Sequence, residues 1–468
     1  MCGVFGIRSP ERDVSRLAYF GLFALQHRGQ ESAGIAVSDG GHLTVLREMG
    51  LVAHVFDEEQ LQALPGEVAI GHTRYSTTGA NKWSNAQPLV HHGSARTIAL
   101  GHNGNLVNVE ELREELIADG IRLASGSDSE LIAALIARDP SALVEAVAAT
   151  MRRLEGAYSV TALVDDTLVA FRDPRGFRPL SLGQIGDDWV VASETCALDL
   201  VGAEVVRDVR PGEVVWVDEE GLHAAQAVPA GRSALCIFEH VYFARPDSRV
   251  GGVEVHGARV RMGERLAEEA PAEADLVIGV ADGGTPAAIG FSKGSGIPYN
   301  EALIKNRYVA RTFIQPEQGM REQGIRMKFN PLDEVEGTRI VVVDDSIVRG
   351  NTTRQLVQML FDAGAAEVHV RISSPPVVSP CFYGIDMADE DELAAAHRSV
   401  DEMRIHIGAT SLHYLSVEGM QEATRLPEDS VCRACFTRDY PTRVPPRPEK
   451  LRFEPARARG SLHPELAE

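Results

Sequence analysis

The stretch from residue 339 to residue 353 constrains the fold more than any other part of the chain. It reads Arg-Ile-Val-Val-Val-Asp-Asp-Ser-Ile-Val-Arg-Gly-Asn-Thr-Thr. The apolar run 340–343 is typical of a buried strand, and the carboxylates of Asp344 and Asp345 follow it before a Gly turn opens a helix. In open α/β sheets, ligands bind at the carboxyl ends of such strands. The stretch therefore predicts a parallel α/β domain with a site at this edge.

The residues after this strand favour a phosphorylated ligand. Backbone amides of the turn and of the helix N-terminus attract an anion, and Thr352 and Thr353 add hydroxyl donors. Two adjacent carboxylates would repel the same phosphate, so we expect Asp344 and Asp345 to face ribose hydroxyls and a magnesium ion that neutralises a pyrophosphate. The alternative for the acidic pair alone is a surface turn after a core strand.

The complete string resembles the phosphoribosyl pyrophosphate loop of type I phosphoribosyltransferases. Its wording Val-Asp-Asp-Ser-Ile-Val-Arg-Gly is similar to that of the amidophosphoribosyltransferase family in particular. The resemblance implies that Mg2+ is held by Asp344 and Asp345. It also implies a set of phosphoribosyl pyrophosphate-binding residues in this loop: Asp344, Asp345, Ser346, Arg349, Gly350, Thr352 and Thr353.

A second candidate site lies at the N-terminus, where Cys2 follows Met1 directly. Because the second residue is small, removal of Met1 is permitted, and Cys2 would then carry a free α-amine beside its thiol. The amine titrates near about 8 and the thiol near about 8.5 in model peptides, so a modest shift lets the amine accept the thiol proton. The alternative for this start alone is an incidental cysteine.

Further polar motifs follow in the first half, at 25–35, 71–76, 101–104 and 127–130. Arg74 can pair with the carboxylate of a free amino acid and Asp128 with its ammonium group. Asn103 and the amide of Gly104 can hold an oxyanion. Taken alone, Arg74 or Asp128 would more often be a solvated surface charge.

These four segments, in this order, resemble the glutaminase domain of the same family. The resemblance implies an N-terminal-nucleophile hydrolase, with Cys2, Asn103 and Gly104 as catalytic residues and Arg74 and Asp128 as glutamine-binding residues. It also implies that glutamine yields a γ-glutamyl thioester and ammonia, and that water later releases glutamate.

Apolar patterning divides the chain into two domains and a tail. Short apolar runs at 67–70, 97–100 and 159–164 indicate a strand-rich first half. Helices are expected at 108–118 and 128–137, the second with Ser127 as its cap and Glu130 completing a capping box. Beyond about residue 228, apolar strands alternate with helical periods, which favours a parallel sheet.

Together with the resemblance, this pattern predicts a fold and domain limits. We expect an αββα sandwich of the N-terminal-nucleophile hydrolase type over residues 2–228. A type I phosphoribosyltransferase domain, of parallel-sheet α/β architecture, is expected over 229–444. Residues 445–468 are rich in Pro and charge and are expected to form a C-terminal tail.

The segment 305–328 is rich in cations and contains Gly319 and Gly324. It resembles the family's flexible loop, which implies that Lys305 and Arg307 bind phosphoribosyl pyrophosphate and that ammonia passes through a transient channel. An ordinary basic surface loop is the alternative. The chain departs from the family at Gly283, where many members carry a serine near the pyrophosphate, so an altered phosphate contact is expected there.

Four of the six cysteines form a candidate metal centre. Cys236, Cys381, Cys432 and Cys435 resemble the ligand segments of iron–sulfur members of the family, which implies a [4Fe–4S] cluster. The Cys-x-x-Cys pair alone is also compatible with a zinc half-site or a redox pair, and four thiolates suit zinc as well as a cluster. Cluster-bearing members commonly begin with a short propeptide, which is missing before Cys2. Cys196 has no motif partner and is expected in the core.

Composition excludes several classes of partner. With 46 basic and 67 acidic side chains the net charge is −21, which disfavours nucleic acid. The chain contains no secretory leader pattern and no apolar run of about 18 residues. The few scattered cysteines do not form a disulfide framework. We therefore expect a cytoplasmic protein with no membrane partner.

The resemblance as a whole implies an enzyme that forms 5-phosphoribosylamine from phosphoribosyl pyrophosphate and glutamine, the entry step of purine synthesis. It further implies a homotetramer inhibited by purine nucleotides. One alternative is a homologue that keeps only glutaminase chemistry or uses another phosphoribosyl acceptor. A second is a non-catalytic regulator, although such a protein would have no use for Cys2, Arg74, Asn103 and Asp128.

Overall fold

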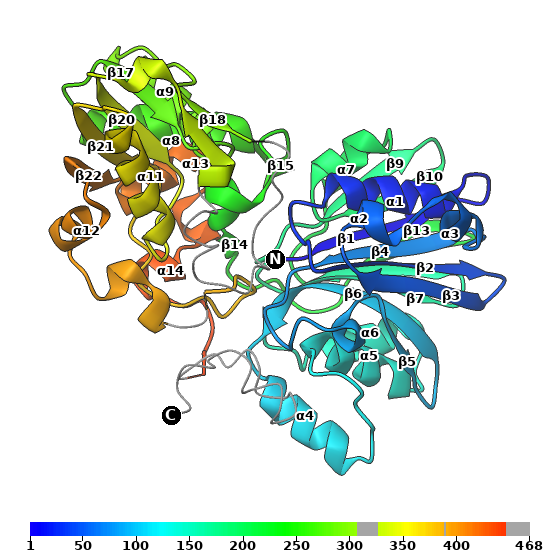
Figure 1. Ribbon diagram of the computed structural model, residues 1–468. Coiled ribbons are helices and arrows are strands. Elements are labelled where there is room, and N and C mark those ends of the chain that lie inside the picture. The colour runs from blue at the N-terminus through cyan, green and yellow to red at the C-terminus, as the bar shows by residue number, and fades with distance from the viewer. Residues whose placement is uncertain (307–325, 388–389, 446–468) are drawn as a thin grey trace, which may run out of the picture.

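The computed structural model describes residues 1–306, 326–387 and 390–445 of the 468-residue chain. Figure 1 shows two lobes, with the N-terminus of the chain located between them. One lobe contains two large antiparallel sheets and the other a parallel sheet of four strands.

The first lobe is a sandwich of a seven-stranded and a six-stranded sheet. In spatial order the larger sheet contains β11 (Glu204–Asp208), β9 (Ser181–Ile185), β10 (Asp188–Ala192), β1 (Gly3–Arg8), β4 (Val68–Arg74), β2 (Ser32–Asp39) and β3 (His42–Met49). The smaller contains β13 (Gly221–Gln226), β12 (Glu213–Asp218), β8 (Thr167–Arg172), β7 (Gly156–Val164), β6 (Thr97–Leu106) and β5 (Leu89–His92). Val4 and Ile70 of one sheet share a buried core with Leu163 and Val215 of the other, which holds the two sheets face to face.

Helices cover the outer faces of this sandwich. The helices on the larger sheet are α1 (Val14–Ala24) and α7 (Thr195–Leu200), with the short α2 (Val52–Val55) and α3 (Glu58–Gln62) nearby. Those on the smaller sheet are α4 (Val109–Ala118), α5 (Asp128–Arg138) and α6 (Leu143–Met151). The expected αββα layering is confirmed.

The second lobe is built on four parallel strands with apolar clusters on both faces. The strands, in spatial order, are β17 (Leu276–Gly279), β20 (Arg339–Asp344), β21 (Glu367–Ile372) and β22 (Ser411–Tyr414). The helices are α8 (Val255–Glu269), α9 (Thr285–Ser295), α11 (Asn351–Asp362), α12 (Val400–Ile407), α13 (Val417–Thr424) and α14 (Ala434–Thr437). This arrangement confirms the expected parallel α/β domain.

Short ladders complete the second lobe. They are formed by β14 (Leu235–Cys236) with β23 (Val431–Cys432), β15 (Arg249–Val250) with β16 (Val253–Glu254), and β18 (Leu303–Lys305) with β19 (Phe329–Pro331). The first ladder is parallel and pairs Cys236 with Cys432, so it joins the beginning of the lobe to its end. A π-helical turn, η2 (Glu239–Phe243), follows β14 at the junction between the lobes.

Both helices expected in the first half are present as α4 and α5, but the sequence did not indicate α1 and α6. Ser127 caps α5 by accepting a hydrogen bond from the amide of Ser129. The expected capping box was wrong, because Glu130 instead accepts hydrogen bonds from the amides of Ala124 and Ser125. Within the described ranges, no helix has the length and apolar character needed to cross a membrane.

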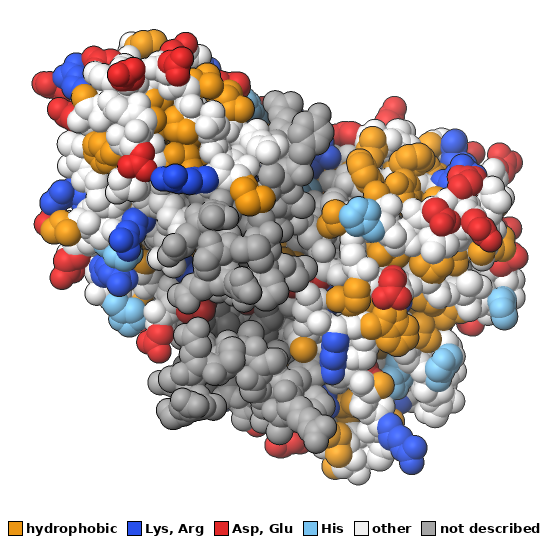
Figure 2. Space-filling model, viewed as in Figure 1, with side chains coloured by type: hydrophobic (Ala, Val, Ile, Leu, Met, Phe, Trp, Pro, Cys, Tyr) orange, Lys and Arg blue, Asp and Glu red, His pale blue; other side chains and the backbone are white. Residues whose placement is uncertain are grey.

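Charged side chains are mixed over the surface. Figure 2 shows Lys and Arg interspersed with Asp and Glu over the visible face of both lobes.

Candidate active sites and family

Cys2 lies immediately before β1, where the first strand enters the sandwich. Its amide donates to Oδ1 of Asn103 at 3.2 Å, and its thiol lies 3.5 Å from the carbonyl oxygen and 3.5 Å from the amide nitrogen of Tyr75. The residue is 9% exposed, and burial raises the pKa of the thiol. The thiol therefore needs a nearby base in order to act as a nucleophile.

Asn103 and Gly104 lie on β6, beside Cys2. The side-chain nitrogen of Asn103 is buried and has no hydrogen-bond partner in the part of the chain that the structure describes. Gly104 has a φ of 153°, and a Cβ added there would lie 2.0 Å from the carbonyl oxygen of Ala157. Only glycine fits at this position. A buried donor without a protein partner is suited to a ligand oxygen.

The two charged residues expected to bind glutamine are also buried. The guanidinium of Arg74 lies 3.3 Å from Glu31 and 3.2 Å from the carbonyl oxygen of Ala80. Asp128, at the start of α5, accepts a hydrogen bond of 3.0 Å from the amide of Leu106. Their exposed fractions are 2% and 4%, so neither is a solvated surface charge.

The segment 75–80 connects these groups. Its first residue contacts the Cys2 thiol, Thr77 donates to the carbonyl oxygen of Gly104 at 3.5 Å, and the carbonyl of Ala80 contacts Arg74. The structure thus brings Cys2, Asn103, Gly104 and Arg74 together around one segment. Asp128 is held at the end of β6, because its carboxylate accepts a hydrogen bond from the amide of Leu106.

The second site lies where β20 ends. The amide of Asp345 donates to a carboxylate oxygen of Asp344 at 2.9 Å, and the hydroxyl of Ser346 donates to Asp345 at 2.7 Å. Burial, together with the charge of Asp345, raises the pKa of Asp344 well above its usual value. A cation at this position would relieve the repulsion between the two carboxylates, so the donor set fits a magnesium ion.

The remaining loop residues surround this strand end. Gly350, with a φ of 81°, is the N-cap of α11, and Thr352 and Thr353 lie in the first turn of that helix. Arg349 forms an ion pair with Glu392. The structure therefore places the amides of the helix N-terminus directly after the acidic pair.

Lys305 and Gly283 lie on neighbouring segments. Lys305 forms an ion pair with Asp282, whereas Arg307 and most of the expected flexible loop lie outside the described residues. A Cβ added to Gly283 would lie 2.0 Å from a carboxylate oxygen of Asp345. The absence of a side chain at Gly283 therefore leaves room for the Asp345 carboxylate in its present position.

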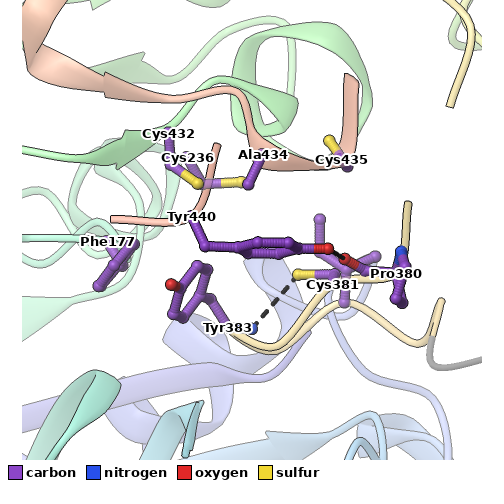
Figure 3. Close-up of a pocket in the computed structure, with 10 residues that line it drawn as sticks. Phe177, Cys236, Pro380, Cys381, Tyr383, Cys432, Ala434, Cys435 and Tyr440 are labelled. Carbon is purple, nitrogen blue, oxygen red and sulfur yellow. Dashed lines mark hydrogen bonds between the residues drawn. The ribbon is translucent and has the colours of Figure 1, made fainter. Parts of the chain in front are cut away.

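The four candidate metal ligands line one cavity, with a volume of about 10 Å³. This volume is about the space needed for one water molecule. The other lining residues include Phe177 and Tyr440, and Figure 3 shows the four sulfur atoms around the Tyr440 ring. Cys196 is buried in another core.

The thiol set fits a metal centre in its chemistry but not in its present spacing. Burial and the three other thiols raise the pKa of Cys435 well above its usual value, a repulsion that a bound cation would remove. The amide of Tyr383 donates to the sulfur of Cys381 at 3.4 Å. Across the described ranges, however, no three His, Cys, Asp or Glu side chains are arranged around a single ion position.

Sequence reasoning missed several residues that hold these sites. Glu31 contacts Arg74 and Ser76, and Tyr75 contacts the Cys2 thiol. Both lie inside the motifs at 25–35 and 71–76, which were the only signal available. Arg28 and Glu239 contact one another although they are 211 residues apart, so no local pattern could relate them.

Known proteins resemble this chain along most of its length. The family model described as "Glutamine amidotransferase domain" matches residues 72–200. Amidophosphoribosyltransferase of Synechococcus elongatus is 53% identical over 95% of this chain and 92% of its own. The Bacillus subtilis protein of the same name is 47% identical over 95% of this chain and 94% of its own.

Solved structures agree with the sequence relatives. The Bacillus subtilis glutamine phosphoribosylpyrophosphate amidotransferase complexed with ADP and GMP has a TM-score of 0.89 and 46% identity, covering 95% of this chain and 98% of that one. A structure described as the allosteric regulatory enzyme of purine biosynthesis has a TM-score of 0.91 and 46% identity, over 96% and 98% of the two chains. With both candidate sites in place and these similarities over nearly the whole length, the chain belongs to the amidophosphoribosyltransferase family.

Proposed function

We propose that this chain is a glycosyltransferase that forms 5-phosphoribosylamine, glutamate and pyrophosphate from phosphoribosyl pyrophosphate, glutamine and water. This reaction is the first committed step of de novo purine biosynthesis. The observation that carries the proposal is the presence, in one chain, of a buried Cys2–Asn103 pair and of an acidic strand end followed by a helix N-terminus. Family membership supports it over 95% of the length.

In the glutaminase half, the Cys2 thiol attacks the side-chain amide carbon of glutamine. Once Met1 is removed, the α-amine of Cys2 accepts the thiol proton and passes it to the departing ammonia. The surroundings support this role, because the Cys2 nitrogen, which becomes the α-amine, already donates to Oδ1 of Asn103 at 3.2 Å. Water then cleaves the γ-glutamyl thioester and releases glutamate.

The developing oxyanion is held by the side-chain nitrogen of Asn103 and the amide of Gly104. The unpartnered buried nitrogen of Asn103 supports this assignment. Arg74 binds the α-carboxylate of glutamine and Asp128 its ammonium group. Arg74 is buried, 3.3 Å from the Glu31 carboxylate and 3.2 Å from the Ala80 carbonyl, and its planar guanidinium is suited to pair with a second carboxylate, that of glutamine.

In the transferase half, ammonia attacks C1 of the ribose while pyrophosphate leaves. Asp344 and Asp345 would hold Mg2+, which would neutralise negative charge on the pyrophosphate. We place the 5-phosphate of phosphoribosyl pyrophosphate beside the amides at Gly350 and the hydroxyls of Thr352 and Thr353. Ser346, Arg349, Lys305 and Arg307 complete the proposed set. Ammonia is mostly ammonium in water, so we propose a shielded path between the sites.

We propose that Cys236, Cys381, Cys432 and Cys435 hold a [4Fe–4S] cluster that ties the beginning of the second lobe to its end. The shared cavity and the repulsion among the thiols support a metal centre. Zinc is the alternative metal for the same four thiols. The described side chains do not surround a single ion, but a [4Fe–4S] cluster needs no such position, because each thiolate binds a different iron atom.

We also propose the inhibitors, the oligomeric state, the domain limits and the cellular compartment of this protein. Purine nucleotides are proposed as inhibitors because the Bacillus subtilis relative is complexed with ADP and GMP, and a homotetramer is proposed from the family. The proposed domain limits are 2–228 and 229–444, with a tail over 445–468. Free thiols at all six cysteines support a reducing, cytoplasmic compartment.

The assay that separates the candidate functions follows the loss of phosphoribosyl pyrophosphate with Mg2+ and either glutamine or ammonia. The proposed function requires loss with both nitrogen donors. A protein that keeps only glutaminase chemistry would release glutamate without consuming phosphoribosyl pyrophosphate. A non-catalytic regulator would bind the compound and consume neither substrate.

A further inference from the structure

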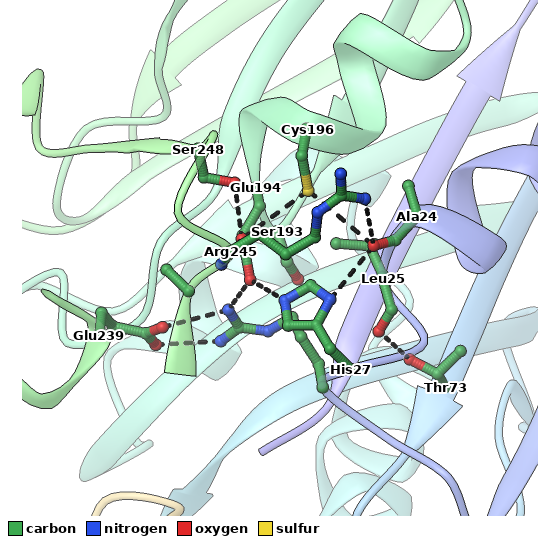
Figure 4. A network of polar contacts seen from close by, with 12 residues as sticks. Ala24, Leu25, His27, Thr73, Ser193, Glu194, Cys196, Glu239, Arg245 and Ser248 are labelled. Carbon is green, nitrogen blue, oxygen red and sulfur yellow. Dashed lines mark hydrogen bonds and ion pairs between the residues drawn. The ribbon is translucent and has the colours of Figure 1, made fainter. Parts of the chain in front are cut away.

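Arg28 is a buried cation that contacts the backbone of the nucleophile. Its side chain is 0% exposed, and its Nε donates to the carbonyl oxygen of Cys2 at 2.9 Å. Its two terminal nitrogens reach the carboxylates of Glu194 and Glu239. Figure 4 shows these carboxylates approaching from different segments, Glu194 beside α7 and Glu239 from the second lobe.

Glu239 meets Arg28 in a two-pronged ion pair. The two nitrogen–oxygen distances are 3.1 and 3.0 Å, and both side chains are 0% exposed. Burial alone would lower the pKa of Arg28, but Glu239 and Glu194 outweigh burial and raise it. Arg28 therefore stays charged, and the parallel hydrogen bonds fix the plane of its guanidinium.

The same carboxylate reaches a second buried arginine. An oxygen of Glu239 lies 3.5 Å from Arg178, whose Nε donates to the carbonyl oxygen of Tyr383 at 2.8 Å. The next residue, Gly384, packs so closely on Gly104 that an added Cβ would lie 3.0 Å from the Gly104 carbonyl carbon. One carboxylate of the second lobe thus holds arginines that contact the backbone on both sides of the glutaminase site.

We propose that Glu239, a residue of the transferase lobe, is a positioning residue for the glutaminase nucleophile. Through Arg28 it fixes the carbonyl of Cys2 and hence the direction of the thiol. A nucleophile displaced by about 1 Å can lose about a hundredfold in rate. This inference rests on the proposed glutaminase role of Cys2.

The test replaces the carboxylate by its uncharged isostere, Glu239→Gln, in the full-length protein. Two rates are measured: alkylation of Cys2 by iodoacetamide, followed by mass spectrometry of the N-terminal peptide, and glutamine hydrolysis. We expect both the alkylation rate and kcat to fall about tenfold or more. KM for glutamine should stay within about twofold, because Arg74 and Asp128 are untouched.

Glu213→Gln is the matched control. Glu213 is also a buried carboxylate paired with an arginine, Arg207, but it lies on β12, where its side chain accepts hydrogen bonds from Arg207 and from the amide of Arg210. We expect it to leave both rates within about twofold of the parent protein. Glu239→Asp, which keeps the charge on a shorter side chain, should restore part of the loss.

Parent-like rates in folded Glu239→Gln, or an equal loss in Glu213→Gln, would overturn the proposal. If Glu239→Gln does not fold, Arg28→Lys serves instead, because an ammonium cannot reach the Cys2 carbonyl and both oxygens of Glu239 together. Arg28→Lys should show the same loss, and parent-like rates would contradict the proposal. Alkylation needs neither substrate, so a parent protein without turnover contradicts the proposed function, whereas unchanged alkylation contradicts only the role of Glu239.

Discussion

Asn103 gives the oxyanion proposal its clearest test at the scale of single residues. Its side-chain nitrogen is buried without a partner in the described part of the chain, as a donor reserved for substrate would be. We expect Asn103→Ala to lower kcat for glutamine about 100- to 1,000-fold, the usual effect of losing one oxyanion donor. Ammonia-dependent transfer should stay near that of the parent protein. Steady-state kinetics with each nitrogen donor measure this, and a parallel fall in both would contradict the assignment.

Asp344 and Asp345 test the second site. Each substitution by Asn removes a carboxylate that faces ribose or Mg2+ in the proposed complex. Asp344→Asn and Asp345→Asn should each lower ammonia-dependent pyrophosphate release about tenfold or more and spare basal glutamine hydrolysis. If binding and turnover of phosphoribosyl pyrophosphate are unchanged, the pair is only a turn after a core strand.

His72 provides a pH-dependent prediction. Burial lowers its pKa to about 3, below the ordinary value of about 6.5. Between these two values the unfolded chain binds a proton that the folded chain does not. The contribution of His72 to stability is therefore complete above about pH 6.5 and is lost as pH falls.

His72→Gln removes this titration. Between pH 6.5 and 5, the free energy of unfolding of the parent protein should fall by about 1.6 kcal/mol more than that of the variant, because the unfolded His72 is half protonated at pH 6.5 and almost fully protonated at pH 5. Urea unfolding at the two pH values measures the difference. Equal pH dependence in the two proteins would show that folding does not lower the pKa of His72.

At this scale the sequence was informative where a site is contiguous. Cys2, Asn103 and Asp344 each lie within a short motif, and that motif alone predicts a chemical role for the residue. Glu239 was not recognised because its role depends on Arg28, 211 residues away. Contacts of that kind are decided by how the lobes pack.

At the scale of elements, apolar runs with clear periods were predicted well. The run 340–343 forms β20, and the helical period at 108–118 forms α4. The turn η2 was not predicted, because its neighbourhood is an apolar run in which helix and strand cannot be distinguished. The β14–β23 ladder was beyond prediction, since its strands are nearly 200 residues apart.

The cysteine centre belongs to this scale, because it would bind β14 and β23 to the segment around Cys381. We expect Cys432→Ser to reduce the yield of soluble, folded protein more than it reduces catalysis per folded molecule, because the metal contributes to folding. Oxygen should inactivate the parent enzyme slowly. Cys196→Ser, which alters a thiol outside the cavity, is the control.

Anaerobic purification with iron and sulfide analysis measures the centre directly. A [4Fe–4S] cluster predicts four iron and four sulfide atoms per chain, by its definition, with visible absorption. A colourless, iron-free preparation with full activity would contradict the cluster. Stoichiometric zinc would assign the same thiols to the other metal.

At the scale of the whole molecule, the order of the two folds followed from the sequence, but their contact did not. The junction includes buried charged groups, among them Arg28, Glu194 and Glu239, beside an apolar cluster that contains Phe177 and Tyr383. Buried charges are rare in proteins unless paired, and nothing in the pattern of a single segment indicates that its charge will meet a partner in another domain. The arrangement of the two sites relative to one another therefore required the structure.

The proposed function divides the chemistry between the lobes: the first releases ammonia and the second transfers it to phosphoribosyl pyrophosphate. Cys2→Ala tests it most directly, with Asn108→Ala, a change on the first lobe at a residue given no catalytic role, as the control. The measurement compares glutamine-dependent and ammonia-dependent loss of phosphoribosyl pyrophosphate in folded protein. We expect Cys2→Ala to abolish the first rate and to leave the second within about twofold of the parent value. Equal loss of both rates, or survival of the glutamine-dependent rate, would contradict this division of the chemistry.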